Sequence, residues 1–166
     1  GEIGHVTLYK GGEQCGCGNR GCWETFVGPR AIEQNVQRSL ESGAKSSLQD
    51  IANGDLKKIT FDDVLEAAKN GDQISLDALK KVAYYLGIGI ANLVNLLDVE
   101  VIVLGGVLSK ACSLIINDID QVVSSNMLDP EKDHLRIMSS AHGADACVMG
   151  AIALVLDDFI REPAFS

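Results

Sequence analysis

The feature that most constrains this chain is a group of one histidine and three cysteines within its first 22 residues, namely His5, Cys15, Cys17 and Cys22. Zinc is bound in proteins by imidazole nitrogen and thiolate sulfur, and a Cys3His set with no vacant position is typical of structural zinc. The stretch 11–22 is rich in glycine and, apart from its cysteines, has no apolar side chain to stabilise it. A structural zinc can supply that free energy, on the order of 10 kcal/mol in a small finger. We therefore predict a small zinc-binding loop.

Disulfides or unpaired thiols are the alternatives for these cysteines. A single glycine separates Cys15 from Cys17, which would strain a bridge between them. The odd total of five cysteines also fits a secreted disulfide framework poorly. Free thiols in a metal site suit a reducing compartment, so we expect a cytoplasmic protein. Cys112 and Cys147 have apolar neighbours and are expected to be small core residues.

Size and charge limit the class of protein. The chain has 166 residues, of which 46% are apolar, and this is enough for one domain with a real core. Its formal net charge of −9 argues against binding a phosphate backbone, because such binding depends on clustered Lys and Arg. With no apolar run of 18 residues and no signal-like leader, we expect neither secretion nor membrane insertion. The chain begins at Gly1 inside a motif, so we expect it to be the second half of a longer protein.

Hydrophobic periodicity predicts an alternation of strands and helices. The expected elements are a strand over 5–10, a helix over 23–40 that restarts at 28–29, a polar stretch over 41–60, helices over 60–69 and 73–97, a strand over 98–104, a helix over 110–127, a strand over 135–138 and a helix over 143–160. The run at 98–104 is nearly continuous in β-branched residues, which is typical of a strand covered on both faces. The order of the elements predicts an α/β fold with a three-layer sheet domain.

Three blocks of the sequence carry recognisable motifs. They are Gly1-Glu2-Ile3-Gly4-His5 followed by the run from Cys15 to Glu24, the run from Leu86 to Asn95 that leads into Val101-Ile102-Val103-Leu104-Gly105-Gly106, and the run from Gly143 to Ala151. Together they resemble the signature of the ROK family, named for its repressors, open reading frames and sugar kinases. Membership implies an actin-like, ribonuclease H-like ATPase fold of two lobes, in which residues 1–166 would be the carboxy-terminal lobe. Its parts would be the sugar- and zinc-binding signature at 1–24, an insertion-like helical region at about 42–77, and the core sheet and helices at 82–160.

The resemblance also implies which residues meet ligands. In ROK proteins the equivalents of Glu2, His5 and Glu24 contact hydroxyl groups of a bound sugar, and carboxylates suit this because charge-assisted hydrogen bonds are strong. Judged by residue type alone, Glu2 could instead be a solvated strand end and Glu24 a first-turn acid favoured by the helix dipole. In the kinases the equivalents of Gly105 and Gly106 lie against an adenine nucleotide, although a tight strand-to-helix turn explains two glycines as well.

Two functions compete for the whole protein. ROK kinases carry their phosphate loop and catalytic aspartate in the amino-terminal half, and neither is present in this chain, so by itself it should not catalyse phosphorylation. Three features favour a sugar-responsive repressor, namely Val107-Leu108-Ser109 after the two glycines, the polar stretch at 42–77 and the extension at 159–166. The alternative is an ATP-dependent sugar kinase of the glucokinase, fructokinase or N-acetylhexosamine kinase type, which would use ATP and Mg²⁺.

The regulator interpretation implies particular partners. A monosaccharide would close the two lobes of each subunit in a homodimer or homotetramer, a population shift limited by the difference in its affinity for the two states. DNA would be bound only through a winged helix in an absent amino-terminal segment, and no membrane contact is expected. A third possibility is an oligomerisation scaffold, in which the apolar helix at 83–97 lies at a dimer interface instead of within the core.

Overall fold

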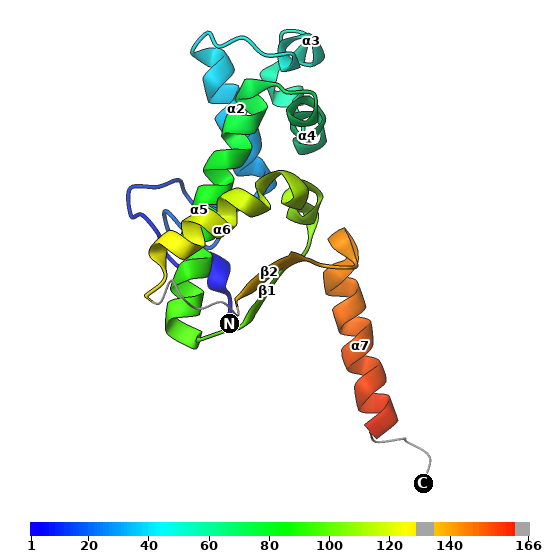
Figure 1. Cartoon of the computed structure of the whole chain (residues 1–166). Coiled ribbons are helices and arrows are strands. Elements are labelled where there is room, and N and C mark those ends of the chain that lie inside the picture. The colour runs from blue at the N-terminus through cyan, green and yellow to red at the C-terminus, as the bar shows by residue number, and fades with distance from the viewer. Residues whose placement is uncertain (129–134, 162–166) are drawn as a thin grey trace.

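A computed structural model describes residues 1–128 and 135–161, and Figure 1 shows how their elements are arranged. The α-helices are α1 (Glu24–Val27), α2 (Pro29–Glu41), α3 (Leu48–Ala52), α4 (Phe61–Lys69), α5 (Gln73–Leu97), α6 (Cys112–Asn126) and α7 (Ala146–Arg161). The strands are β1 (Val101–Leu104) and β2 (Arg136–Ser139). Short 3₁₀ turns are η1 (Ile3–His5), η2 (Leu56–Lys58), η3 (Val107–Ala111) and η4 (Gly143–Asp145). Residues 162–166 of the predicted extension lie outside the described residues.

The centre of the molecule is the long helix α5, which packs against α2, α4 and α6. About half of the residues at 83–97 are buried within this chain, so this part of the helix belongs to the core, whereas Tyr84, Leu96 and Leu97 are exposed. Two glycines let neighbouring groups approach the helix. A methyl group at Gly87 would lie 2.6 Å from Cβ of Val122 in α6. One at Gly89 would lie 2.1 Å from the ring of Trp23, and glycine is therefore required at both positions.

Local side-chain signals set the starts of α4 and α5. Thr60 Oγ1 accepts a hydrogen bond from the Asp63 N–H at 3.3 Å, and the Asp63 carboxylate accepts one from the Thr60 N–H at 2.8 Å. This reciprocal pair is a capping box. Asp72 caps α5 by accepting from the Ser75 N–H at 2.9 Å, and its other oxygen accepts from the Ser47 N–H, also at 2.9 Å. Both predicted helix starts are confirmed.

The sheet is smaller and more open than predicted. β1 and β2 run parallel, with Val101 paired to Arg136, and η3 and α6 connect them. Successive side chains of a strand point to opposite faces. Ile102 and Ile137 pack on the core, whereas Val103 on the other face is 56% exposed. Within the described residues the sheet is therefore covered on one face only, and the predictions of a doubly covered strand and of a third layer are wrong there.

Helix α7 extends away from the rest of the described residues (Figure 1), and none of its residues is buried. Leu154 and Ile160 are both 74% exposed. Cys147 near its start is exposed too, so its prediction as a core residue is wrong, while Cys112 is buried as predicted. Among the described residues, no helix is both long enough and apolar enough to cross a membrane.

Residues 5–10 do not form the predicted strand. The 3₁₀ turn η1 covers Ile3–His5, and a single antiparallel bridge joins Thr7 to Cys22. The chain then turns, because the Gly12 N–H donates to the carbonyl oxygen of Tyr9 at 2.9 Å. Within residues 1–128 and 135–161, this bridge is not extended into a ladder.

Candidate functional site

The cysteine loop, residues 11–22, is tied by its backbone to the residues just before it. Cys22 forms the bridge to Thr7, and a second bridge closes the tip of the loop. Gly21 has a φ of 68°, and a Cβ atom there would lie 1.6 Å from the carbonyl oxygen of Tyr9. Only glycine fits such a close crossing of two backbones. The path of the loop over Tyr9 therefore depends on this residue.

This path brings the four predicted metal ligands together. Their ligand atoms, one each from His5, Cys15, Cys17 and Cys22, all lie within 4.8 Å of one another. The Sγ atoms of Cys17 and Cys22 are 3.6 Å apart, and Cys15 Sγ is also 3.6 Å from Nδ1 of His5. Sulfur ligands at about 2.3 Å from a tetrahedral zinc ion are separated by about 3.8 Å. The donor types and their spacing fit a tetrahedral metal ion.

The three thiols of the cluster differ in their surroundings. Cys15 and Cys22 are buried, and Cys17 is exposed. The hydrogen bond of 2.8 Å that Cys15 Sγ donates to the Glu24 carboxylate raises the pKa of Cys15 to about 12, and burial raises the pKa of Cys22. The backbone N–H of Asn19 lowers the pKa of Cys17. Because thiolates are the metal-binding form, a bound cation would displace protons from these thiols.

Two glutamates approach this cluster on different sides of the imidazole ring. Nε2 of His5 is 3.0 Å from Glu2 Oε2, whereas Nδ1, which faces the thiols, is 3.7 Å from Glu24 Oε1. Both carboxylates are accessible, since the Glu2 side chain is 79% exposed and that of Glu24 is 49% exposed. Gly4 lies beside Glu24, since a methyl group at Gly4 would be in ordinary contact with Cβ of Glu24 at 3.5 Å. The structure thus brings together the three residues that the motif predicts to meet sugar.

A groove of about 470 Å³ opens between the cysteine loop and α2, with Glu24 in its lining. Arg30 and Gln34 of α2 also line it. Neither belongs to the predicted motif, although their spacing of four residues places them on one face of the helix. Their polar groups add hydrogen-bond donors and acceptors to the carboxylate of Glu24. The groove can therefore bind a polar small molecule.

The two glycines predicted to meet a nucleotide lie just after β1. Gly106 has a φ of 71°, and its N–H donates to the carbonyl oxygen of Gly143 at 3.1 Å. A methyl group at Gly105 would lie 3.0 Å from Cβ of Ala146. The second and third sequence motifs therefore meet at the carboxyl end of the strand, where parallel sheets commonly bind ligands. The tight turn by itself also explains a glycine at Gly106, whose φ is positive, and the close approach of Ala146 favours one at Gly105.

The sequence matches one known family along most of its length. A profile described as the ROK family matches residues 1–158. A xylose repressor from Caldicellulosiruptor bescii is 31% identical over 166 residues, which are 100% of this chain and 41% of the repressor. A glucokinase from Halalkalibacterium halodurans is 36% identical over 159 residues, which cover 93% of this chain and 47% of the enzyme. The chain therefore spans less than half the length of these curated relatives.

The fold is shared with a solved ROK protein. The chain superposes on a ROK family glucokinase from Streptomyces griseus, in complex with glucose and AMPPNP, with a TM-score of 0.84 and 27% sequence identity. The match covers 92% of this chain and 50% of the glucokinase chain. The helices and the small parallel sheet therefore have the arrangement of one part of that enzyme.

Proposed function

This chain belongs to the ROK family, and we propose that it is the sugar-binding effector lobe of a ROK transcriptional regulator, stabilised by zinc. The family contains both repressors and sugar kinases, since both occur among the relatives. The observation that carries the proposal is the placement of Glu2 and Glu24 around His5, beside the three thiols. The xylose repressor matches 100% of the chain and the glucokinase matches 93%, so the coverage of the chain favours the regulator only slightly.

In this proposal zinc is bound by the thiolates of Cys15, Cys17 and Cys22 and by Nδ1 of His5. Nδ1 is chosen because it is the ring nitrogen that faces Cys15 Sγ, which leaves Nε2 for a ligand on the accessible side. The ion has a structural role. It holds the end of the cysteine loop, and Glu24 follows that end by two residues, so the metal sets the position of this carboxylate. Reduced thiols of this kind suit the cytoplasm.

The sugar would be recognised through its hydroxyl groups. The carboxylates of Glu2 and Glu24 accept hydrogen bonds and have no donors, whereas a monosaccharide presents several O–H donors. Charge-assisted hydrogen bonds are about twice as strong as neutral ones. A carboxylate left without its hydroxyl partner is costly, so such a site rejects a sugar that lacks the hydroxyl or holds it in another orientation.

The regulator would convert sugar binding into a change of DNA affinity. A sugar held between this lobe and an amino-terminal lobe of the actin-like fold would favour the closed arrangement, by no more than its difference in affinity for the two states. In a homodimer or homotetramer, closure would change the spacing of two DNA-binding segments. The net charge of −9 supports a DNA contact outside these residues, in an amino-terminal segment.

A second candidate is the carboxy-terminal half of an ATP-dependent ROK sugar kinase. It is favoured by the fold match to the Streptomyces griseus glucokinase, which was solved with glucose and AMPPNP. Gly105 and Gly106 would then lie against the nucleotide, and ATP would bind with Mg²⁺. Two assays of the intact protein separate the candidates, namely DNA affinity with and without sugar, and transfer of phosphate from ATP to the sugar. Phosphate transfer without DNA binding would reject the regulator.

The substitution Glu24→Gln tests the sugar site directly. It keeps the size of the side chain but removes the charge, so the affinity for the sugar should fall about 10- to 100-fold. Titration calorimetry of the intact protein with D-xylose and with D-glucose, the sugars named in the relatives, measures this affinity. Zinc content and the unfolding temperature should be close to those of the unchanged protein.

Glu41→Gln is the matched control, since Glu41 is an exposed glutamate at the end of α2 and lines none of the described cavities that border Glu24. It should bind sugar like the unchanged protein. If Glu24→Gln also kept the full affinity while Glu41→Gln behaved as expected, Glu24 would not be a sugar ligand.

A further inference from the structure

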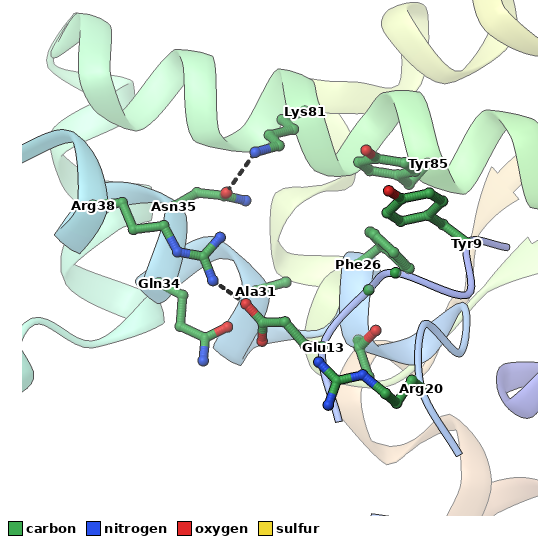
Figure 2. A pocket seen from close by; sticks show the side chains of 13 residues that line it. Tyr9, Glu13, Arg20, Phe26, Ala31, Gln34, Asn35, Arg38, Lys81 and Tyr85 are labelled. Atoms are coloured by element: carbon green, nitrogen blue, oxygen red, sulfur yellow. Dashed lines mark hydrogen bonds and ion pairs between the residues drawn. The ribbon is translucent and has the colours of Figure 1, made fainter. Parts of the chain in front are cut away.

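A second cavity lies next to the groove that contains Glu24, between the cysteine loop, α2 and α5. Its volume is about 330 Å³. Figure 2 shows the side chains that line it. The loop contributes Arg20, α2 contributes Arg38, and α5 contributes Lys81. Three positive charges from distant parts of the sequence therefore surround one cavity, in a chain whose net charge is −9.

These cations have little negative charge to neutralise them. Arg38 forms an ion pair with Glu13, the one acidic residue of the lining. Lys81 Nζ donates to the amide oxygen of Asn35 at 2.9 Å, and Arg20 Nη1 donates to the amide oxygen of Gln14 at 3.4 Å. Both acceptors are neutral. Three cations and one carboxylate leave two positive charges in the lining, which a dianion would balance.

An aromatic wall completes the cavity. Phe26 and Tyr85 lie with their ring centroids 4.6 Å apart, and Tyr9, also in the lining, is 64% exposed. Figure 2 shows the three rings together beside the polar groups. Aromatic faces bind the apolar face of another ring, while arginine and lysine bind phosphate oxygens. The two halves of the lining therefore suit one ligand that carries both a ring and an anionic group.

We propose that this cavity binds a small organic phosphate, with its phosphate group between Arg20, Arg38 and Lys81 and its ring against Tyr9 and Tyr85. The phosphate is favoured over a monoanion because it balances the two surplus charges. None of Glu2, His5 and Glu24 lines the cavity, so the proposal does not rest on the sugar-binding role of these residues, although the cavity adjoins the groove beside Glu24.

The cavity and the groove beside Glu24 share four lining residues, namely Glu13, Thr25, Ala31 and Gln34, of which Glu13 is the charged one. A phosphate that binds Arg38 competes with the Glu13 carboxylate for the same guanidinium. Binding therefore releases Glu13 on the segment that leads to Cys15, and the phosphate acts on the loop next to the sugar site.

Calorimetric titration of the intact, metal-loaded protein with ribose 5-phosphate tests the proposal. Ribose and inorganic phosphate are the comparison ligands, and each should bind at least about 10-fold more weakly because it lacks one half of the contacts. Lys81→Gln should weaken the binding of ribose 5-phosphate about 10-fold. Lys80→Gln, which removes the same charge from the next, exposed residue outside the lining, should leave it unchanged.

Glu13→Gln should strengthen the binding of ribose 5-phosphate, whereas Lys81→Gln should weaken it. It removes the competitor for Arg38, so ribose 5-phosphate should bind about threefold more tightly, which a merely structural contact would not produce. The proposal is overturned if ribose 5-phosphate does not bind, or if Lys80→Gln weakens binding as much as Lys81→Gln. It is also overturned if Glu24→Gln abolishes binding while Lys81→Gln has no effect, because the phosphate would then occupy the sugar site.

Discussion

The cysteine loop and the helical body formed by α2, α4 and α5 are stabilised in different ways. The helical body buries a continuous apolar cluster, with Ile32, Val64 and Val82 all at 0% exposure. In the cysteine loop Cys15 and Cys22 are the buried side chains, and the backbone makes only isolated bridges. Hydrophobic burial therefore accounts for the body but not for the loop. The difference fits our proposal that a metal ion stabilises the loop beside Glu2 and Glu24, whereas the helical scaffold behind them needs none.

Metal removal should have the largest effect, and it should act on the loop alone. The protein should purify with about one zinc ion per chain. A chelator, or the substitution Cys22→Ser, should release the ion and with it a stabilisation on the order of 10 kcal/mol. The amides of the loop should then exchange freely while those of α5 stay protected. Hydrogen exchange read by mass spectrometry reports both regions in one sample.

Cys147→Ser is the control for that experiment, because it makes the same change at an exposed thiol on α7, outside the cluster. Zinc content and the protection of the loop should both be kept. A loop that stayed protected in metal-free protein would show that backbone bridges alone hold it, and the contrast between the two regions would be lost.

A substitution that removes a buried side chain from the helical body should have the next largest effect on stability. Ile32 of α2 is fully buried, so Ile32→Ala should lower the free energy of unfolding by about 3 kcal/mol. Ile51→Ala removes the same atoms from a residue that is 48% exposed and should cost less than about 1 kcal/mol. Urea unfolding followed by circular dichroism measures both. Equal losses would mean that the body does not owe its stability to this core.

The smallest effect concerns the helix cap at Asp72. Burial alone would raise the pKa of this carboxyl, but hydrogen bonds from Ser75, Ser46 and Ser47 outweigh it and lower the pKa from 3.8 to about 2. A pKa that is lower in the folded state gives stability that is fully present above about pH 4 and is lost as the pH falls towards 2. Asp72→Ala should therefore cost about 1 kcal/mol at neutral pH and have little effect near pH 2.

Asp158→Ala, on the exposed helix α7, is the matched control for the cap. Thermal unfolding between pH 2 and pH 7 should show a pH-dependent difference from the unchanged protein for Asp72→Ala and none for Asp158→Ala. A constant difference at every pH would mean that Asp72 acts by its shape and not by its charge.

Much of the helical structure and the composition of the cysteine cluster were predictable from the sequence. The capping box at Thr60, the cap at Asp72 and the span of α5 follow from side chains within a few residues of one another. The cluster of His5 with three cysteines is also a local pattern, and the four donors do converge. The family membership predicted from the motifs is confirmed by the match of the ROK profile to residues 1–158.

The wrong predictions concern elements whose structure depends on which other elements pack or pair with them. The strand predicted at 5–10 is an alternating sequence that, in the part of the chain that the structure describes, pairs with a neighbour only through the bridge from Thr7 to Cys22. Val103 has a side chain suited to a buried strand, yet nothing among the described residues covers it. Periodicity reports which faces of an element are apolar, but it does not report whether another element packs there.

By itself, the sequence determined the local features of this protein, namely its helix starts, its glycine-rich loop and the donor types of the proposed zinc site, because these depend on residues close together in the chain. Only the tertiary structure decided which nitrogen of His5 faces the thiols and which glutamate lies on each side of the ring. It also brought Arg20, Arg38 and Lys81 to one cavity. Residues so far apart in sequence meet only through packing, and no local pattern encodes that meeting.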